Sequence, residues 1–163
     1  MSFDTILNDY KKRRDKAQGM GGPERLAKIK ARGSLNARER IDYLFDSGTF
    51  MESGLFATSF IPEAQDSTPT DGKVCGYGQI VGREAAVVSH DLTIKGASSS
   101  LTNVKKMRHM RETAIKNGMP LVLFNESSGA RIPDTMGAVG TGALGQDNEQ
   151  FIRRREIPYA AAV

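Results

Sequence analysis

The spacing of apolar residues predicts helices near the start of the chain. Four apolar side chains recur there at helical intervals: Phe3, Ile6, Leu7 and Tyr10. This pattern is typical of an amphipathic helix. The glycine-rich stretch 19–23 interrupts that helix. Pro23 suits the first turn of a second helix, with Leu26 and Ile29 on its apolar side. Residues 1–33 are therefore predicted to form a basic helical arm.

A third helix is predicted from its capping residues. Asn36 can cap a helix, and Glu39, three residues later, completes a capping-box pattern. The side chains predicted to face the core are Ile41, Leu44 and Phe45. Gly48 is expected to end this helix in a left-handed conformation.

The middle of the chain carries the pattern of a β-hairpin. Residues 57–70 contain two prolines in a polar stretch and are predicted to form a loop. Residues 73–81 alternate in polarity, residues 84–89 are apolar, and Gly82 lies between them. Two strands around a short glycine-containing turn predict a hairpin.

A helix and then a buried strand are predicted next. After the small polar stretch 96–100, a helix is expected from Thr102 to Asn117, and Gly118 closes it. Its inward side chains are expected to be Val104, Met107, Met110 and Ala114. The short apolar run 121–124 follows that helix, as parallel strands in α/β sheets do.

The remaining residues mix loop, glycine and strand signals. Residues 125–134 are predicted to form a tight loop, 137–145 a flexible glycine-rich tract, and 147–155 a short polar helix. Residues 158–163 have the pattern of another buried strand, at which the sequence stops. An ordered strand needs neighbours on both sides, so we expect a fragment, a truncated product or one piece of a split enzyme. An unpaired last strand also predicts an oligomer or an aggregation-prone edge.

Composition and charge favour an anionic partner without naming it. The 163 residues are 39% hydrophobic and 26% charged, which suits one globular domain. The net charge of +4 leaves nucleic acid, an anionic membrane and a phosphorylated small molecule open. In the arm, however, basic residues are interleaved with acids and have few aromatic neighbours for base stacking. We therefore favour an arm that packs on other protein over one that binds nucleic acid.

Several classes of site are excluded by the pattern of cysteines, histidines and apolar runs. Cys75 is the only cysteine, so neither an intrachain disulfide nor a four-cysteine zinc site can form. His90 and His109 lie in no ligand-spaced cluster, so no metal site is predicted. A catalytic dyad of His90 and Asp91 is disfavoured, because adjacent strand residues point to opposite faces. No apolar run resembles a secretory signal or reaches the roughly 20 residues of a membrane helix, and the cytoplasm is the expected compartment.

Four separate blocks of the sequence occur in the order and spacing of one enzyme family. They are residues 31–50 (ARGSLNARERIDYLFDSGTF), 71–81 (DGKVCGYGQIV), 85–95 (AAVVSHDLTIK) and 117–132 (NGMPLVLFNESSGARI). Together they resemble the acyl-CoA carboxyltransferases, which include the β subunits of propionyl-CoA carboxylase and the carboxyltransferases of sodium-pumping decarboxylases. The order of the four blocks makes this resemblance specific, whereas a lone SGAR match would carry little information.

The resemblance implies an α/β fold similar to crotonase, in which β-β-α units stack into a superhelix. Residues 34–163 would form an incomplete N-terminal carboxyltransferase domain, truncated at its C-terminal end and preceded by the helical arm. In such enzymes the N domain holds the acyl-CoA, and the C domain of a neighbouring subunit receives carboxybiotin.

The resemblance also implies an oxyanion hole made of backbone N–H groups. Carboxylation at the α-carbon of a thioester passes through an enolate, whose negative charge such donors stabilise. The residues implied are Ser128, Gly129 and Ala130. Ser128 stands where most relatives have glycine, and a backbone donor survives that change if φ at the site is negative. The plainer interpretation of this segment is an ordinary turn after a strand.

Coenzyme A contacts are implied at five further positions: Gly96, Ala97, Lys105, Lys106 and Arg131. The basic helix after Ser100 would face the phosphates, because free N–H groups and the helix dipole attract anions. A solvated basic helix face is the alternative interpretation. Glu126 and Arg131 are also expected to pair with each other.

The function implied is transfer of a carboxyl group from carboxybiotin to an acyl-CoA. Biotin would be carried by a separate carrier protein and loaded by a biotin carboxylase, and neither nucleic acid nor membrane is an expected partner. We expect the isolated fragment to be inactive, and the complete enzyme to be a homo-oligomer or to include a complementary C-terminal chain. The alternatives are a non-catalytic module for CoA-ester binding or assembly, and a decarboxylase subunit.

Overall fold

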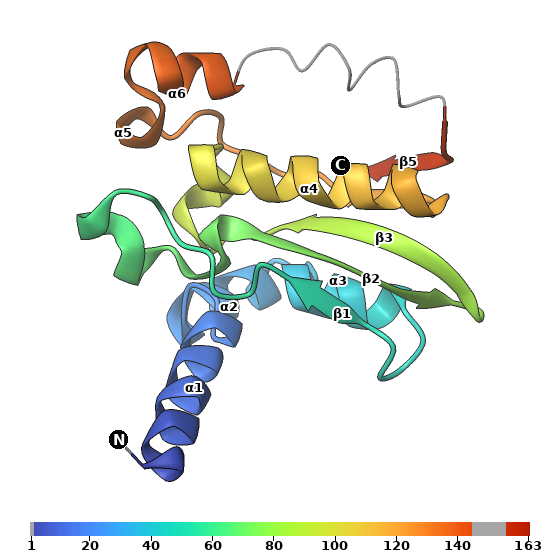
Figure 1. Cartoon of the computed structure of the whole chain (residues 1–163), viewed down its shortest axis with the longest axis horizontal. Helices are drawn as coiled ribbons and strands as arrows, with labels where there is room; N and C mark the ends of the chain where they lie inside the picture. Colours follow the sequence, from blue (N-terminus) through green and yellow to red (C-terminus); the bar gives the residue numbers. More distant parts are fainter. Residues whose placement is uncertain (1, 145–155) are drawn as a thin grey trace.

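The computed structural model of the chain describes residues 2–144 and 156–163 (Figure 1). Its first part is helical, as the sequence predicts. Helix α1 spans Phe3–Gln18, and the Ser2 hydroxyl accepts a hydrogen bond from the Thr5 N–H at its start. Helix α2 spans Pro23–Ala31 and begins at the proline. These two helices correspond to the predicted basic arm.

Helix α3, Ala37–Leu44, begins with the predicted capping box and ends earlier than expected. The Asn36 side chain accepts from the backbone of the first turn, and the Glu39 carboxylate accepts from the Asn36 N–H at 2.8 Å. The helix ends at Leu44, where Phe45 turns to extended backbone. Gly48 has φ +76°, but it lies in the turn after the helix, so its predicted role as the helix-ending residue is wrong.

A five-stranded mixed sheet forms the centre of the molecule. Its strands lie in sequence order: β1 Met51–Ser53, β2 Lys73–Ile80, β3 Arg83–His90, β4 Leu121–Phe124 and β5 Tyr159–Ala162. The first three are antiparallel, and β3, β4 and β5 are parallel. Helix α4, Leu101–Asn117, supplies the crossover between β3 and β4. The predicted hairpin and the strand β4 are confirmed. A strand also forms at β5, but all four of its residues are exposed, so the prediction of a buried strand there is wrong.

Both faces of the sheet are covered, α4 lying on one and α3 on the other (Figure 1). Alternate residues of β2 and β3 therefore enter different cores. Against α4 lie Cys75, Ala86, Val88 and Leu121, with Met110 and Ala114 of the helix. Against α3 lie Val74, Ala85 and Val87, with Ile41 and Phe45. Burial on both sides explains why 84–89 is almost continuously apolar.

The predicted loop 57–70 and the glycine-rich tract contain short helices. Two 3-10 turns, η1 Pro62–Ser67 and η2 Pro69–Gly72, occupy the first segment. After the short helix α5, Ile132–Thr135, the glycine-rich tract forms helix α6, Gly137–Leu144, so its interpretation as a flexible tract is wrong. The helix predicted over 147–155 lies outside the described residues.

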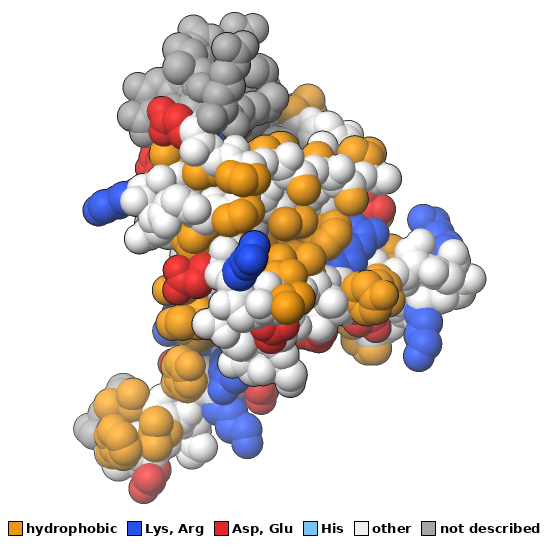
Figure 2. All heavy atoms as spheres, turned by 90° about the vertical axis from the view of Figure 1, so that its right-hand side faces the viewer, with side chains coloured by type: hydrophobic (Ala, Val, Ile, Leu, Met, Phe, Trp, Pro, Cys, Tyr) orange, Lys and Arg blue, Asp and Glu red, His pale blue; other side chains and the backbone are white. Residues whose placement is uncertain are grey.

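Helix α1 projects from the body and leaves apolar side chains in solvent. Figure 2 shows them gathered on the lobe at the lower left. They are Phe3, Ile6, Leu7 and Tyr10, with exposed fractions from 47% to 72%. Within the described ranges, no helix has the length and apolarity that crossing a bilayer requires.

Candidate functional site

Two loops from the carboxyl ends of neighbouring parallel strands lie against each other. The first follows β3 and contains the 3-10 turn η3, Lys95–Ala97; the second is the segment 125–131 that follows β4. The Ser128 N–H donates to the Gly96 carbonyl at 2.9 Å, and the Ser127 hydroxyl donates to the Ala97 carbonyl at 3.2 Å. The two loops are thereby held as one surface.

A short parallel bridge extends this contact. Ser99 N–H donates to the Gly129 carbonyl at 2.7 Å, and Arg131 N–H donates to the Ser99 carbonyl at 2.8 Å. The side chains of residues 127–130 remain exposed. The second loop therefore has a fixed backbone and an open outer face, as a ligand-binding loop requires.

Backbone strain is concentrated beside these loops. Lys95, Gly96 and Ala97 have consecutive φ values of +48°, +61° and +52°. Thr70 and Asp71 have φ values of +53° and +48°. Such conformations cost on the order of 1–3 kcal/mol each for residues other than glycine, and they cluster at functional sites. The strain marks this end of the sheet as the candidate site.

The three predicted oxyanion donors are not equally available. The Ser128 N–H is used by the Gly96 carbonyl. The Gly129 N–H points to the nearby Ser127 hydroxyl at 3.2 Å, and the Ala130 N–H makes no hydrogen bond within the described part of the chain. This arrangement removes Ser128 from the available donors and leaves Gly129 and Ala130.

The backbone of Ser128 has no left-handed strain. Ser128 is not among the residues with positive φ, whereas Gly129 has φ +103°. The serine side chain instead packs on the opposite loop, where a Cβ added to Gly96 would lie 2.5 Å from the Ser128 hydroxyl oxygen. Gly96 therefore serves the close approach of the two loops.

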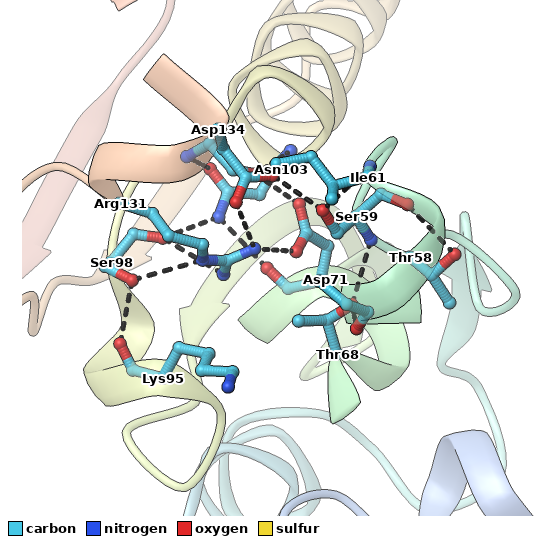
Figure 3. Close-up of polar contacts among 12 residues, drawn as sticks. Thr58, Ser59, Ile61, Thr68, Asp71, Lys95, Ser98, Asn103, Arg131 and Asp134 are labelled. Carbon is cyan, nitrogen blue, oxygen red and sulfur yellow. Dashed lines mark hydrogen bonds and ion pairs between the residues drawn. The ribbon is translucent and has the colours of Figure 1, made fainter. Parts of the chain in front are cut away.

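A buried ion pair supports the second loop from below (Figure 3). Arg131 Nη1 lies 2.5 Å from Asp71 Oδ1 and 3.7 Å from Asp134 Oδ2. Asp71 is 0% exposed and Arg131 8% exposed. The predicted pairing of Arg131 with Glu126 is wrong, because Glu126 pairs with Arg40 at 2.9 Å. The guanidinium that was expected to contact coenzyme A is thus buried and holds the loop in place.

The same carboxylate organises the beginning of α4. The Ser100 hydroxyl donates to Asp71 Oδ2, and Asn103 Nδ2 donates to the Asp71 carbonyl at 3.0 Å. Ser100 and Asn103 also form a capping box and are both 0% exposed. At the start of α4, the N–H groups of Ser100 and Asn103 are therefore bonded within the protein. Attraction of a phosphate to this end of the helix stays a prediction.

The two lysines nominated for coenzyme A differ in position. Lys105 is exposed. Lys106 turns inward, and its ammonium donates to the carbonyls of Thr70 at 2.8 Å and Lys73 at 2.6 Å. Burial lowers the pKa of Lys106. Of these two lysines, Lys105 alone presents a charge that a phosphate could reach without displacing hydrogen bonds to the backbone.

A second buried cluster lies behind the two loops and was not predicted. Lys73 Nζ donates to the Ala97 carbonyl at 2.7 Å and lies 3.0 Å from His90 Nδ1, which is 2.7 Å from the Glu126 carbonyl. Burial lowers the pKa of Lys73 to about 7 and that of His90 to about 4. Asp91 instead accepts from Thr93, so His90 and Asp91 form no dyad.

Sequence reasoning missed most of these buried polar residues. Ser100 and Asn103 could have been found, since serine followed by asparagine three positions later at the start of a predicted helix resembles a capping box. Lys73 is the first residue of the predicted strand and Asp71 lies two positions before it, and the strand pattern does not indicate that either side chain is buried. Across residues 2–144 and 156–163, no group of three or more histidine, cysteine, aspartate or glutamate side chains could hold a metal ion.

The family of the chain follows from a comparison with known proteins. Residues 28–163 match the carboxyl transferase domain family. The chain belongs to this family. It is 40% identical over 147 residues to the propionyl-CoA carboxylase beta chain of Roseobacter denitrificans, which covers 88% of this chain and 29% of that protein. It is 37% identical over 137 residues to the methylmalonyl-CoA decarboxylase subunit alpha of Propionigenium modestum, covering 82% of this chain and 26% of that protein.

Solved structures of the carboxyl transferase family share the fold. The chain superposes on transcarboxylase 12S, solved with methylmalonyl-coenzyme A and methylmalonic acid bound, with a TM-score of 0.85 and 28% identity. That match covers 99% of this chain and 32% of the other. The crotonase-like α/β fold expected from the sequence is therefore confirmed. The chain spans less than a third of the length of these relatives.

Proposed function

We propose that this chain is the acyl-CoA-binding portion of a biotin-dependent carboxyltransferase. The observation that carries the proposal is the exposed loop 127–130, whose backbone is fixed by the opposite loop and by the buried pair of Arg131 and Asp71. Donors fixed in this way need little reorganisation when charge develops on a ligand. Membership of the carboxyl transferase family supports a thioester as that ligand.

The chemistry proposed for this chain is stabilisation of a thioester enolate. The α-proton would pass to biotin, and the electron pair that it leaves would delocalise onto the thioester oxygen. The N–H groups of Gly129 and Ala130 would donate to that oxygen, and removal of one such donor typically costs roughly 3–4 kcal/mol. For Gly129 this requires its weak contact with the Ser127 hydroxyl, at 3.2 Å, to be exchanged for the ligand.

The phosphates of coenzyme A are proposed to contact Lys105, and the pantetheine to pass beside Gly96; Ala97, also predicted as a contact, is 0% exposed. The carboxyl group would come from carboxybiotin on a separate carrier protein, loaded by a biotin carboxylase, and no described residue of this chain is assigned to biotin. An oligomeric enzyme and a cytoplasmic location belong to the same proposal.

Binding of acyl-CoA to the purified chain tests the proposal. We expect calorimetry to detect saturable binding of propionyl-CoA, weaker binding of a propyl thioether analogue that lacks the carbonyl oxygen, and no competition from DNA. Lys105→Glu should weaken propionyl-CoA binding by about tenfold, or about 1.4 kcal/mol. Lys116→Glu, at an exposed position near the other end of α4, is the matched control. Equal affinities for thioester and thioether would overturn the oxyanion role.

A non-catalytic module for CoA-ester binding or assembly is the second candidate. It is favoured by the hydrogen bond from the Ser128 N–H to the Gly96 carbonyl, which occupies one of the three predicted oxyanion donors. The two candidates differ in whether acyl-CoA exchanges its α-proton with solvent in the presence of the chain. Deuterium incorporation into propionyl-CoA, followed by mass spectrometry, would support the catalytic candidate. Because the isolated chain is expected to be inactive, the module is supported only if exchange is still absent after biotin and the remaining part of the carboxyltransferase are added.

A further inference from the structure

Lys73 and His90 form a buried pair directly beneath the two loops. They face each other across β2 and β3, where they are register partners. Lys73 is 1% exposed and His90 3% exposed. Lys73 reaches the first loop through the Ala97 carbonyl, and His90 reaches the second loop through the backbone of Glu126. The pair therefore contacts both loops of the candidate site and does not itself lie on the exposed face.

The contacts of His90 Nδ1 require two different positions for one hydrogen. The Glu126 carbonyl, 2.7 Å away, is an acceptor and needs a hydrogen on Nδ1. A charged Lys73, 3.0 Å away, is a donor and needs a lone pair there. The Glu126 N–H, 3.3 Å away, also needs the lone pair. Nε2 has no hydrogen-bond partner within the described chain, so no other contact fixes the hydrogen of the ring.

Two arrangements satisfy these contacts in turn. When Lys73 is neutral, Nδ1–H donates to the Glu126 carbonyl, and the amine lone pair faces the ring. When Lys73 takes up a proton, the ammonium donates to both the Ala97 carbonyl and the Nδ1 lone pair, and the ring hydrogen moves to Nε2. With neutral Lys73, His90 binds the loop after β4 through the Glu126 carbonyl. With charged Lys73, the hydrogen bond to the Ala97 carbonyl in the loop after β3 is strengthened.

We propose that Lys73 and His90 are positioning residues for the candidate thioester site, and that the proton taken up by Lys73 decides which of the two loops the pair holds. This inference rests on the proposed function for its ligand, but the pairing itself concerns only residues of this chain. It assigns a role to a buried lysine and a buried histidine that touch neither the thioester nor coenzyme A.

The charges around the pair set the pH at which it changes. Burial is the main cause of the lowered pKa of Lys73, to about 7, and Arg131 from the second loop lowers it further. Three groups raise it: Cys75 on β2, Asp71 on η2 and Asp91 after β3. For His90, burial comes first, followed by Lys73, with Arg40 of α3 also lowering its pKa. Lys73 is thus the member of the pair that titrates near neutrality.

Nitrogen NMR of the imidazole rings tests the shared proton directly. In the 15N-labelled chain, the spectrum should place the His90 hydrogen on Nε2 at about pH 6 and on Nδ1 at about pH 8.5. The midpoint should lie near the lysine pKa of about 7. The amide signals of Gly129 and Ala130 should shift with the same midpoint. His109, exposed on α4, gives the other imidazole signal and serves as a reference.

Variants separate positioning from a purely structural role. Lys73→Met should keep the hydrogen on Nδ1 at every pH and abolish the pH-dependent amide shifts. Lys73→Gln, which retains a donor that does not titrate, should also make the tautomer and the amide shifts independent of pH. Lys116→Met removes an exposed lysine elsewhere and should leave the titration unchanged. A wild-type tautomer that is constant over this pH range would overturn the proposal, and this measurement needs no variant.

Binding measurements distinguish this inference from the proposed function. In the wild type, propionyl-CoA affinity should differ severalfold between about pH 6 and about pH 8.5, and in Lys73→Met it should be flat. If the tautomer changes and the amides shift but no acyl-CoA binds, the proposed function fails while the positioning of the loops stands. If acyl-CoA binds equally well with a constant tautomer, the positioning role fails and the proposed function stands.

Discussion

At the level of single residues, Val81 has a backbone conformation that its side chain opposes. Val81 and Gly82, the two residues between β2 and β3, have φ values of +51° and +73°. Positive φ at both central residues is typical of a type I′ turn, which favours asparagine followed by glycine. A β-branched residue at positive φ is strained. The side chain of Val81 is 87% exposed, so no core packing offsets this strain.

We expect Val81→Asn to increase the free energy of unfolding by about 1 kcal/mol, because asparagine tolerates the left-handed conformation. Urea unfolding of the two proteins would measure the change. Asp46→Ala is the opposing variant, since the Asp46 carboxylate accepts from the N–H groups of Val81 at 3.1 Å and Gly82 at 2.8 Å. A lower urea midpoint for Val81→Asn would contradict the prediction.

The stability of the fold should depend on pH through Lys73. Its pKa is lowered by burial from 10.5 to about 7, so above pH 7 the unfolded chain holds a proton at this residue that the folded chain has lost. Stability from this group therefore rises with pH through that window. Cys75 has the opposite effect above its ordinary pKa of 9.0, because burial raises its pKa to about 11. Between pH 7 and pH 9, the effect of Lys73 on stability is therefore separate from that of Cys75.

Within that window we expect the wild type to gain about 2 kcal/mol relative to Lys73→Met, whose side chain does not titrate. Urea unfolding at the two ends of the window would give the difference. A parallel change in both proteins would show that another group carries the pH dependence.

Pairing between distant residues was the part of the site that the sequence could not predict. Arg131 was expected to pair with Glu126, five positions away, but pairs with Asp71, 60 positions away. Nothing local distinguishes these two carboxylates. The SSGAR segment was identified through its resemblance to a family, yet the loss of Ser128 as a donor depends on the Gly96 carbonyl of another loop. Local patterns predict elements, and contacts between loops decide which backbone groups stay available.

At the level of elements, predictions succeeded where capping residues marked the start or the end of a helix. The capping box at Asn36 was recognised because both of its partners lie within one turn. Gly118 was expected to close α4 and has φ +67°. The glycine-rich tract 137–144 failed for the opposite reason. Its many glycines suggest a flexible loop, whereas α6 forms where packing against α4 and α5 outweighs low helix propensity.

Two glycines of α6 should respond in opposite ways to alanine. A Cβ at Gly142 would meet open space, so Gly142→Ala should stabilise the protein by about 0.5–1 kcal/mol by lowering the entropy of the unfolded chain. A Cβ at Gly140 would lie 2.5 Å from the Thr135 carbonyl carbon, so Gly140→Ala should destabilise it by about 2 kcal/mol by displacing α5. Thermal unfolding of the two variants, with the wild type, would measure both. Equal effects would show that α6 does not pack as described.

At the level of the whole molecule, the α/β sheet was predictable in outline. The hairpin pattern and the apolar strand after α4 indicated its strands, and the family resemblance supplied the crotonase-like topology. The position of α1 could not be derived. Its apolar side was expected to pack on something, but Phe3, Ile6 and Leu7 face solvent in this chain (Figure 2).

The buried network at the candidate site also constrains the order in which the chain can fold. Its hydrogen bonds join Asp71 to Arg131 across 60 positions and Ser59 to Asp134 across 75. Such contacts close large loops. They stabilise the protein only after the chain between the two residues has lost conformational entropy. The hairpin, by contrast, closes across a two-residue turn. We expect Arg131→Met to leave the folding rate within about twofold and to accelerate unfolding, as stopped-flow kinetics can measure. The loops that would meet a thioester are then the last to be assembled and the first to come apart.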